Sequence, residues 1–109
     1  MYAQLTVFSG PRSPELVAAG ERAGSERIDP LMMSHPVIKD DLVARYVLRQ
    51  PDGGEAVLVV VGHEATLDLA SELVMTSEPL PGEDPQLLPG PTRVERYTVF
   101  DVWGPGVSS

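Results

Sequence analysis

Two histidines, His35 and His63, are the side chains of this 109-residue sequence best suited to proton transfer near neutral pH. We expect His63 to stand where a strand ends and a helix begins, a place where a side chain can face a cavity and act as a general base or proton shuttle. His35 precedes Pro36, and we expect it in a loop. The alternative interpretation of both residues is an ordinary, partly exposed loop histidine.

A metal site would need both histidines to converge with a carboxylate such as Asp40, Asp41 or Glu64. Their spacing follows no ligand motif, and the sequence contains no cysteine. We therefore expect no metal site, no disulfide and no thiol nucleophile. The glycine-rich nucleotide-binding loops, the serine nucleophile elbow and the zinc-protease helix motif are also missing, so the sequence predicts no cofactor.

Several arginines fall on stretches that we expect to be strands. They are Arg45, Arg49, Arg93 and Arg96. An arginine that points into a closed sheet needs a carboxylate partner or an anionic ligand, such as an enolate or a phenolate. The alternative is a surface ion pair across the strands, for example with Glu95 or Asp101.

The aromatic side chains also fall on expected strands. They are Tyr2, Phe8, Tyr46, Tyr97, Phe100 and Trp103. Aromatic residues on a sheet commonly belong to the core or to a dimer interface, but some of these would suit a pocket for a flat, apolar ligand. Met32, Met33 and Met75 would add adaptable walls to such a pocket or, in the alternative interpretation, belong to the core.

The charge balance argues against nucleic acid as a partner. Sixteen acidic residues against eight basic ones give a net charge of −8, and Lys39 is the only lysine. Such an acidic surface repels phosphate groups, so we expect no nucleic-acid binding. No basic N-terminal stretch is present and no window approaches the roughly 18 apolar residues of a membrane span, so we expect a cytoplasmic protein. The preference for arginine over lysine fits a GC-rich bacterial genome.

Hydrophobic periodicity predicts an α+β domain with the order β-α-β-β-α-β. The expected strands cover residues 2–8, 42–49, 56–61 and 93–103. The expected helices cover 14–28 and 67–75, with a short helical piece at 31–33 that ends at His35-Pro36. Residues 1–103 then form a single domain, in which 77–92 is a loop with five prolines, and 104–109 form a flexible tail.

Local signals support these boundaries. Ser13 and Pro14 are typical of the N-cap and first position of a helix, and Thr66 is expected to cap the second helix. Pro51 to Gly54 predict a hairpin turn. The unbroken apolar run of residues 56–61 predicts a central strand that is buried on both faces.

This order predicts one four-stranded antiparallel sheet with both helices on one face. Both alternating sets of strand residues are apolar, so the uncovered face would expose a patch larger than a monomer tolerates. Closing that face against a second copy is the simplest remedy, and the sequence therefore predicts a homodimer.

The stretch HPVIKDDLVARYVLRQPDGGEAVLVVVGHEATLDLASEL resembles the central hairpin and second helix of the dimeric α+β barrel superfamily, and is most similar to its antibiotic-biosynthesis-monooxygenase-like members. The resemblance covers residues 35–75 in local pattern and 1–103 in element order. It implies a ferredoxin-like protomer, sheet-to-sheet dimers, and a small-molecule cavity between each sheet and its helices. Where members often carry Trp-Glu-Ser, this chain has Gly62-His63-Glu64-Ala65, so only Glu64 matches.

The resemblance implies a cofactor-independent monooxygenase that acts on an aromatic or polyketide-like substrate of secondary metabolism. The expected catalytic residues are His63, Arg45 and Tyr46. The expected substrate-binding residues are Tyr2, Phe8, Tyr97, Met32 and Trp103. The alternatives are a polyketide cyclase of the same fold, or a non-catalytic ligand-binding or scaffold protein in which the 77–92 loop acts as a lid or partner contact.

Overall fold

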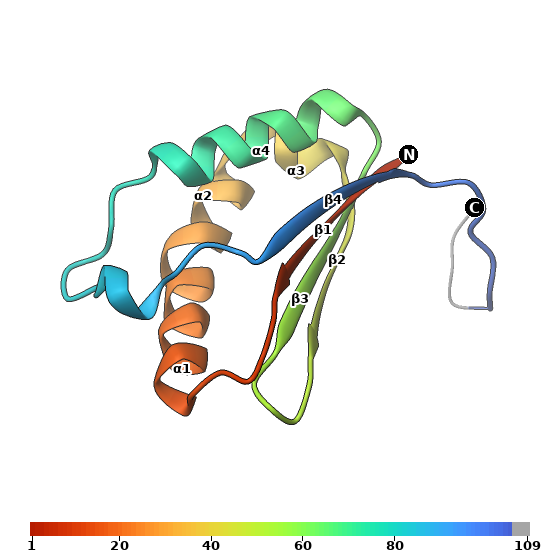
Figure 1. Ribbon diagram of the computed structural model, residues 1–109. Coiled ribbons are helices and arrows are strands. Elements are labelled where there is room, and N and C mark those ends of the chain that lie inside the picture. The colour runs from red at the N-terminus through yellow and green to blue at the C-terminus, as the bar shows by residue number, and fades with distance from the viewer. Residues whose placement is uncertain (106–109) are drawn as a thin grey trace.

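A four-stranded antiparallel sheet, covered on one face by helices, makes up the computed structural model, which describes residues 1–105 (Figure 1). The strands are β1 (Tyr2–Phe8), β2 (Leu42–Arg49), β3 (Glu55–Val61) and β4 (Arg93–Thr98), in the spatial order β2-β3-β1-β4. The predicted order of elements along the chain and the two-layer α+β architecture are confirmed, and β3 is a central strand. The predicted tail lies mostly at 106–109, outside the described residues.

The helical layer contains more pieces than the two helices and one short helical piece that the sequence predicted. It consists of α1 (Pro14–Arg22), a π-helical segment (Ala23–Ile28), α2 (Asp29–Ser34), α3 (Pro36–Asp41) and α4 (Glu64–Thr76). A short 3₁₀ turn (Pro85–Leu87) lies within the 77–92 loop. The predicted cap of α1 is confirmed, since the Ser13 hydroxyl accepts a hydrogen bond from the Leu16 N–H over 3.2 Å. None of the helices in residues 1–105 is long and apolar enough to cross a membrane.

The predicted end of the short helical piece at His35-Pro36 is confirmed, since α2 ends at Ser34 with His35 as its C-cap. The sequence did not predict the helix that follows: Pro36 begins α3, with His35 as the preceding cap residue in an extended conformation. Proline suits the first position of a helix because its missing N–H would have no partner there. The same dipeptide can therefore end one helix and begin the next.

The expected start of α4 at Leu67 is also wrong. The helix begins at Glu64, with His63 at the cap position, and Thr66 lies inside its first turn. The Thr66 hydroxyl is engaged by a residue far away in sequence, Asp41, instead of capping the helix. The residues next to Thr66 in the sequence give no indication of this long-range contact.

The fourth strand ends at Thr98 instead of continuing to Trp103. Thr98 pairs with Tyr2, the first residue of β1, so no neighbouring strand remains for residues beyond it. One further backbone hydrogen bond, from the Val99 N–H to the Met1 carbonyl over 2.9 Å, marks where the chain leaves the sheet. The alternating pattern of residues 99–103 therefore belongs to an extended segment outside the sheet.

Pairing register assigns each strand residue to one of the two faces of the sheet. Arg45, Arg49 and Arg96 contact acidic residues of the helical layer, which places them on the covered face. Because side chains alternate along a strand, the other set lies on the face that carries no helix. We call this set the open face: Ala3, Leu5, Val7, Ala44, Tyr46, Leu48, Ala56, Leu58, Val60, Arg93, Glu95 and Tyr97.

The core between sheet and helices is small. In the described residues its buried apolar side chains are Ala23, Ile38, Val61 and Leu67, while Ala3 is buried on the open face. Val61 pairs with Tyr2 and Leu42 near one end of the sheet, and Leu67 lies in α4. Much of the apolar surface of the strands therefore lies outside this core.

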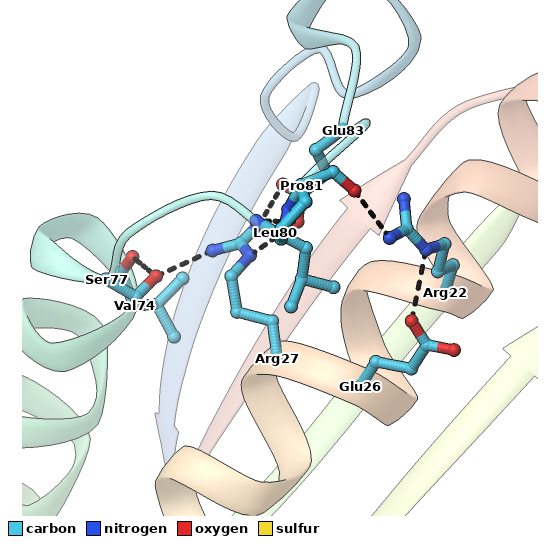
Figure 2. A network of polar contacts seen from close by, with 8 residues as sticks. All are labelled: Arg22, Glu26, Arg27, Val74, Ser77, Leu80, Pro81 and Glu83. Atoms are coloured by element: carbon cyan, nitrogen blue, oxygen red, sulfur yellow. Dashed lines mark hydrogen bonds and ion pairs between the residues drawn. The ribbon is translucent and has the colours of Figure 1, made fainter.

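The proline-rich loop folds back against the helices of its own protomer (Figure 2). The guanidinium of Arg27 lies 3.0 Å from the Glu83 carboxylate and donates a 2.6 Å hydrogen bond to the Ser77 hydroxyl. Arg22 donates to the Pro81 carbonyl over 2.8 Å. Glu83 also accepts from the Leu80 N–H, and these hydrogen bonds lower the pKa of its carboxyl group. This part of the loop is thus attached to α1 and the π-helical segment.

Candidate functional site

The polar cluster that is best arranged for catalysis lies at the junction between β3 and α4. Asp41, the last residue of α3, accepts hydrogen bonds from the His63 backbone N–H over 2.9 Å and from the Thr66 hydroxyl over 2.6 Å. Its other carboxylate oxygen lies 2.8 Å from the His63 Nδ1. The Asp41 backbone carbonyl also accepts from the Gly62 N–H. A single aspartate therefore holds the whole turn that leads into α4.

These contacts further stabilise the ionised form of Asp41. The Thr66 hydroxyl, followed by the His63 side chain, stabilises the carboxylate and lowers the pKa of Asp41 from 3.8 to about 2. A carboxylate only accepts hydrogen bonds, so the Nδ1 that faces it carries a proton. In the neutral imidazole the lone pair then lies on Nε2, the atom able to take a proton from a substrate.

The two side chains of this pair differ strongly in exposure. The Asp41 side chain is 16% exposed, whereas that of His63 is 83% exposed. The anchor is thus protected and the imidazole is open to water. The same contacts have a purely structural value, because they fix the start of α4. The geometry therefore suits a catalytic role for His63 and a structural role for its contact with Asp41.

The other two predicted catalytic residues lie on different sides of the sheet. Arg45 is on the covered face, where its guanidinium pairs with the carboxylate of Asp29 at the start of α2. Tyr46 follows it in β2 and lies on the open face, 54% exposed. Within one protomer these residues do not face a common point, and the catalytic roles of His63, Arg45 and Tyr46 remain predictions.

The predicted substrate-binding residues are also distributed over the molecule. Tyr2 and Phe8 lie on the covered face, and the Arg12 guanidinium sits 5.6 Å from the centre of the Phe8 ring. Tyr97 lies on the open face and donates a hydrogen bond to Glu95, which raises the pKa of the phenol and lowers that of the carboxyl group. The two remaining residues, Met32 in α2 and Trp103 beyond β4, lie outside the sheet.

The strand arginines have carboxylate partners. Arg49 contacts both Glu21 and Glu55, Arg93 contacts Glu95, and Arg96 contacts Asp68. Ion pairing, the alternative to anion binding, therefore accounts for their presence on the strands. Within residues 1–105, no group of three or more histidine and acidic side chains is arranged to hold a metal ion.

The open face carries a groove of about 490 Å³ at the hairpin end of the sheet. Its lining includes the apolar side chains of Leu5, Val7, Leu48 and Ala56 together with charged residues such as Arg93. A second groove, of about 510 Å³, runs between α1 and the β2–β3 turn and is lined partly by charged residues.

The open-face groove and His63 lie at opposite ends of β3. Ala56 lines the groove, whereas His63 follows Val61 at the other end of the strand. At about 3.3 Å per residue this separation is roughly 20 Å. The groove and the imidazole of one protomer therefore do not form a single site.

Comparison with known proteins supports the fold alone. No family model matches the chain, and no curated protein matches it. Among solved structures it is similar to a dimeric ferredoxin-like protein from an uncultured marine organism, with a TM-score of 0.56 over 94% of this chain and 90% of the other, at 8% sequence identity. The fold of this chain is ferredoxin-like. The more specific resemblance to antibiotic-biosynthesis monooxygenases has no matching family model behind it.

The low pKa of Asp41 predicts an acid-dependent contribution to stability. Because the pKa is lower in the folded state than its usual 3.8, the stabilisation is present above that value and is lost as the pH falls toward about 2. Asp41→Asn should therefore lower the urea midpoint at pH 6. The difference between the variant and the wild type should shrink between pH 4 and pH 2.

Asp40→Asn, a change at the exposed neighbouring acid, is the matched control, and we expect the same urea midpoint as the wild type. A destabilisation by Asp41→Asn that stays constant down to pH 2 would contradict the assignment of the low pKa to this carboxyl group.

Proposed function

We propose that this protein is a homodimer that binds a small apolar or aromatic molecule at the open face of its sheet. The observation that carries the proposal is the open face itself. Among its large side chains, Tyr46, Leu48 and Tyr97 are 54%, 50% and 48% exposed in the single protomer. Soluble monomers rarely leave contiguous apolar patches of this kind in water.

Electrostatics favours a second copy as the cover. The chain has a net charge of −8, so two copies repel each other over most of their surfaces. The open face is different, because its charged residues are Arg93 and Glu95, which neutralise each other in an ion pair. Two copies can therefore meet there without like charges in contact. The dimeric state given for the ferredoxin-like structural neighbour agrees with this arrangement.

The groove on the open face is the proposed ligand site. Its volume of about 490 Å³ falls within the range of roughly 300–1,000 Å³ that is usual for small-molecule sites. In the single protomer it opens to solvent. A second copy packed against the sheet would enclose it and exclude water, which suits a flat, apolar ligand such as an aromatic or polyketide-like compound.

Leu48→Asp tests the dimer directly. The substitution places a charge on the open face, within the proposed interface, at a residue that is already half exposed, so folding should be retained while association is lost. We expect sedimentation velocity to show dimers for the wild type and monomers for the variant. The dissociation constant should rise at least about a hundredfold, as expected for a charge that is left unpaired in an interface.

Met75→Asp is the matched control, since Met75 is exposed on α4 in the helical layer. It should remain a dimer. A Leu48→Asp variant that stays dimeric would mean that the copies associate through another surface, and would remove the basis for an enclosed groove.

A second candidate function is cofactor-independent oxygenation, with His63 as the general base. The observation that favours it is the 2.8 Å contact that holds the Nδ1 of His63 against the ionised Asp41. In such a reaction Nε2 takes a proton from an activated substrate CH₂ group, and the resulting carbanion reacts with O₂. One oxygen atom becomes the product carbonyl oxygen, and the other leaves as water.

Two alternatives use the same groove without this base. A polyketide cyclase would only need to hold a reactive chain in a folded pose. A non-catalytic ligand-binding or scaffold protein would need no reactive group at all. The departure from the Trp-Glu-Ser pattern at Gly62-His63-Glu64 favours the non-catalytic protein.

Oxygen uptake with anthrone, a polycyclic ketone whose CH₂ group ionises readily, separates the candidates. If His63 is the base, His63→Ala should lower kcat by about 10²-fold or more, while His35→Ala should leave it unchanged. Equal rates for His63→Ala and the wild type would remove His63 from the mechanism. If the wild-type protein binds anthrone without accelerating its oxidation, a non-catalytic binding role is supported.

A further inference from the structure

We propose that residues 99–105 of each copy pack against the open face of the other, so that Phe100 and Trp103 complete the wall of the partner's groove. This inference rests on the proposed homodimer and adds to it a composite ligand site. Each protomer would both donate its C-terminal segment and receive that of its partner, as a two-fold interface requires.

The exposure of this segment is the first observation. Within the single protomer Phe100 is 100% exposed and Trp103 is 85% exposed. Aromatic side chains of this size usually bury about 150–250 Å² each in cores and interfaces. Two of them within four residues, both in water, indicate a surface that another molecule covers.

The direction of the segment is the second observation. The chain leaves the sheet where β1 begins, and beyond Val99 it runs on the side of the sheet opposite the helices (Figure 1). A second copy packed sheet against sheet would occupy that same space, at about 10 Å from the first sheet. The segment would therefore run alongside the partner.

The direction of the strands determines which part of the partner residues 99–105 would contact. The segment leaves the sheet at the end of β4 that pairs with Tyr2, whereas the groove lies near Val7 and Leu48 at the other end. A two-fold axis that lies between the two stacked sheets and runs perpendicular to their strands brings these opposite ends together. It places Phe100 and Trp103 of one copy over the groove of the other.

Two alternatives to a second copy as the contact of this segment are the open face of its own protomer and a membrane surface. The segment is long enough to fold back over the open face of its own protomer, at about 3.4 Å per extended residue, but it points away from that face in the structure (Figure 1). An anionic membrane surface would be repelled by the net charge of −8. A second copy would contact the segment in the direction that it already takes, at a face where the charges of Arg93 and Glu95 neutralise each other.

The fluorescence of Trp103 provides a direct test, because this residue is the only tryptophan of the chain. We expect the dimer to show blue-shifted emission and at least threefold weaker quenching by acrylamide than the same protein diluted to monomers. Monomeric Leu48→Asp should show the quenching of an exposed tryptophan. Met75→Asp should behave like the wild type.

Phe100→Ala supplies a second readout that leaves the tryptophan in place. It should raise the dimer dissociation constant about tenfold, whereas Val94→Ala, a change at an exposed valine on the covered face, should leave it unchanged.

The outcomes separate the two proposals. A dimer whose Trp103 is quenched as strongly as that of Leu48→Asp would overturn the role of the C-terminal segment but leave the homodimer in place. Protection of Trp103 that persists in Leu48→Asp monomers would mean that the segment folds onto its own protomer, and would also overturn the inference. Absence of a wild-type dimer at any accessible concentration would overturn both.

Discussion

A four-stranded sheet has two faces, and the helices of this chain cover one of them (Figure 1). This imbalance is the constraint on which the remaining features depend. The core beneath the helices is small, and much of the apolar surface of the strands faces the other way. At about 25 cal/mol per Å² of apolar area removed from water, covering that face would add substantially to the stability of a chain of this length. The neutral Arg93–Glu95 pair makes it the part of an acidic protein that can meet its own copy.

The two candidate sites, His63 with Asp41 and the open-face groove, depend on different parts of the structure. Asp41 joins the end of α3 to the start of α4 and thereby orients His63. The groove depends on the open face and lies at the other end of β3. A two-fold axis perpendicular to the strands is the arrangement that would shorten this separation, because it places one end of each sheet over the opposite end of its partner. Chemistry at His63 and binding in the groove would then depend on the same association.

Local patterns in the sequence were sufficient for most of the fold. Alternation predicted β1 and β2 with their observed bounds, and the resulting element order predicted the single layer of helices. The errors have long-range causes. The end of β4 depends on where β1 begins, 96 residues earlier in the pairing of Thr98 with Tyr2, and the role of Asp41 depends on contacts with His63 and Thr66. The sequence indicated His63 as a candidate base but named Asp41 only as a possible metal ligand, because its partners become adjacent only after α3 and α4 have packed.

Native mass spectrometry of the wild-type protein, sprayed from a volatile buffer at low micromolar concentration, tests the central claim most directly. It reports the number of subunits and any retained ligand in the same spectrum. We predict a principal species at twice the chain mass of 11.7 kDa, with additional small mass if a ligand is retained in the enclosed groove. A spectrum that contains only the 11.7 kDa monomer would contradict the claim that a second copy covers the open face.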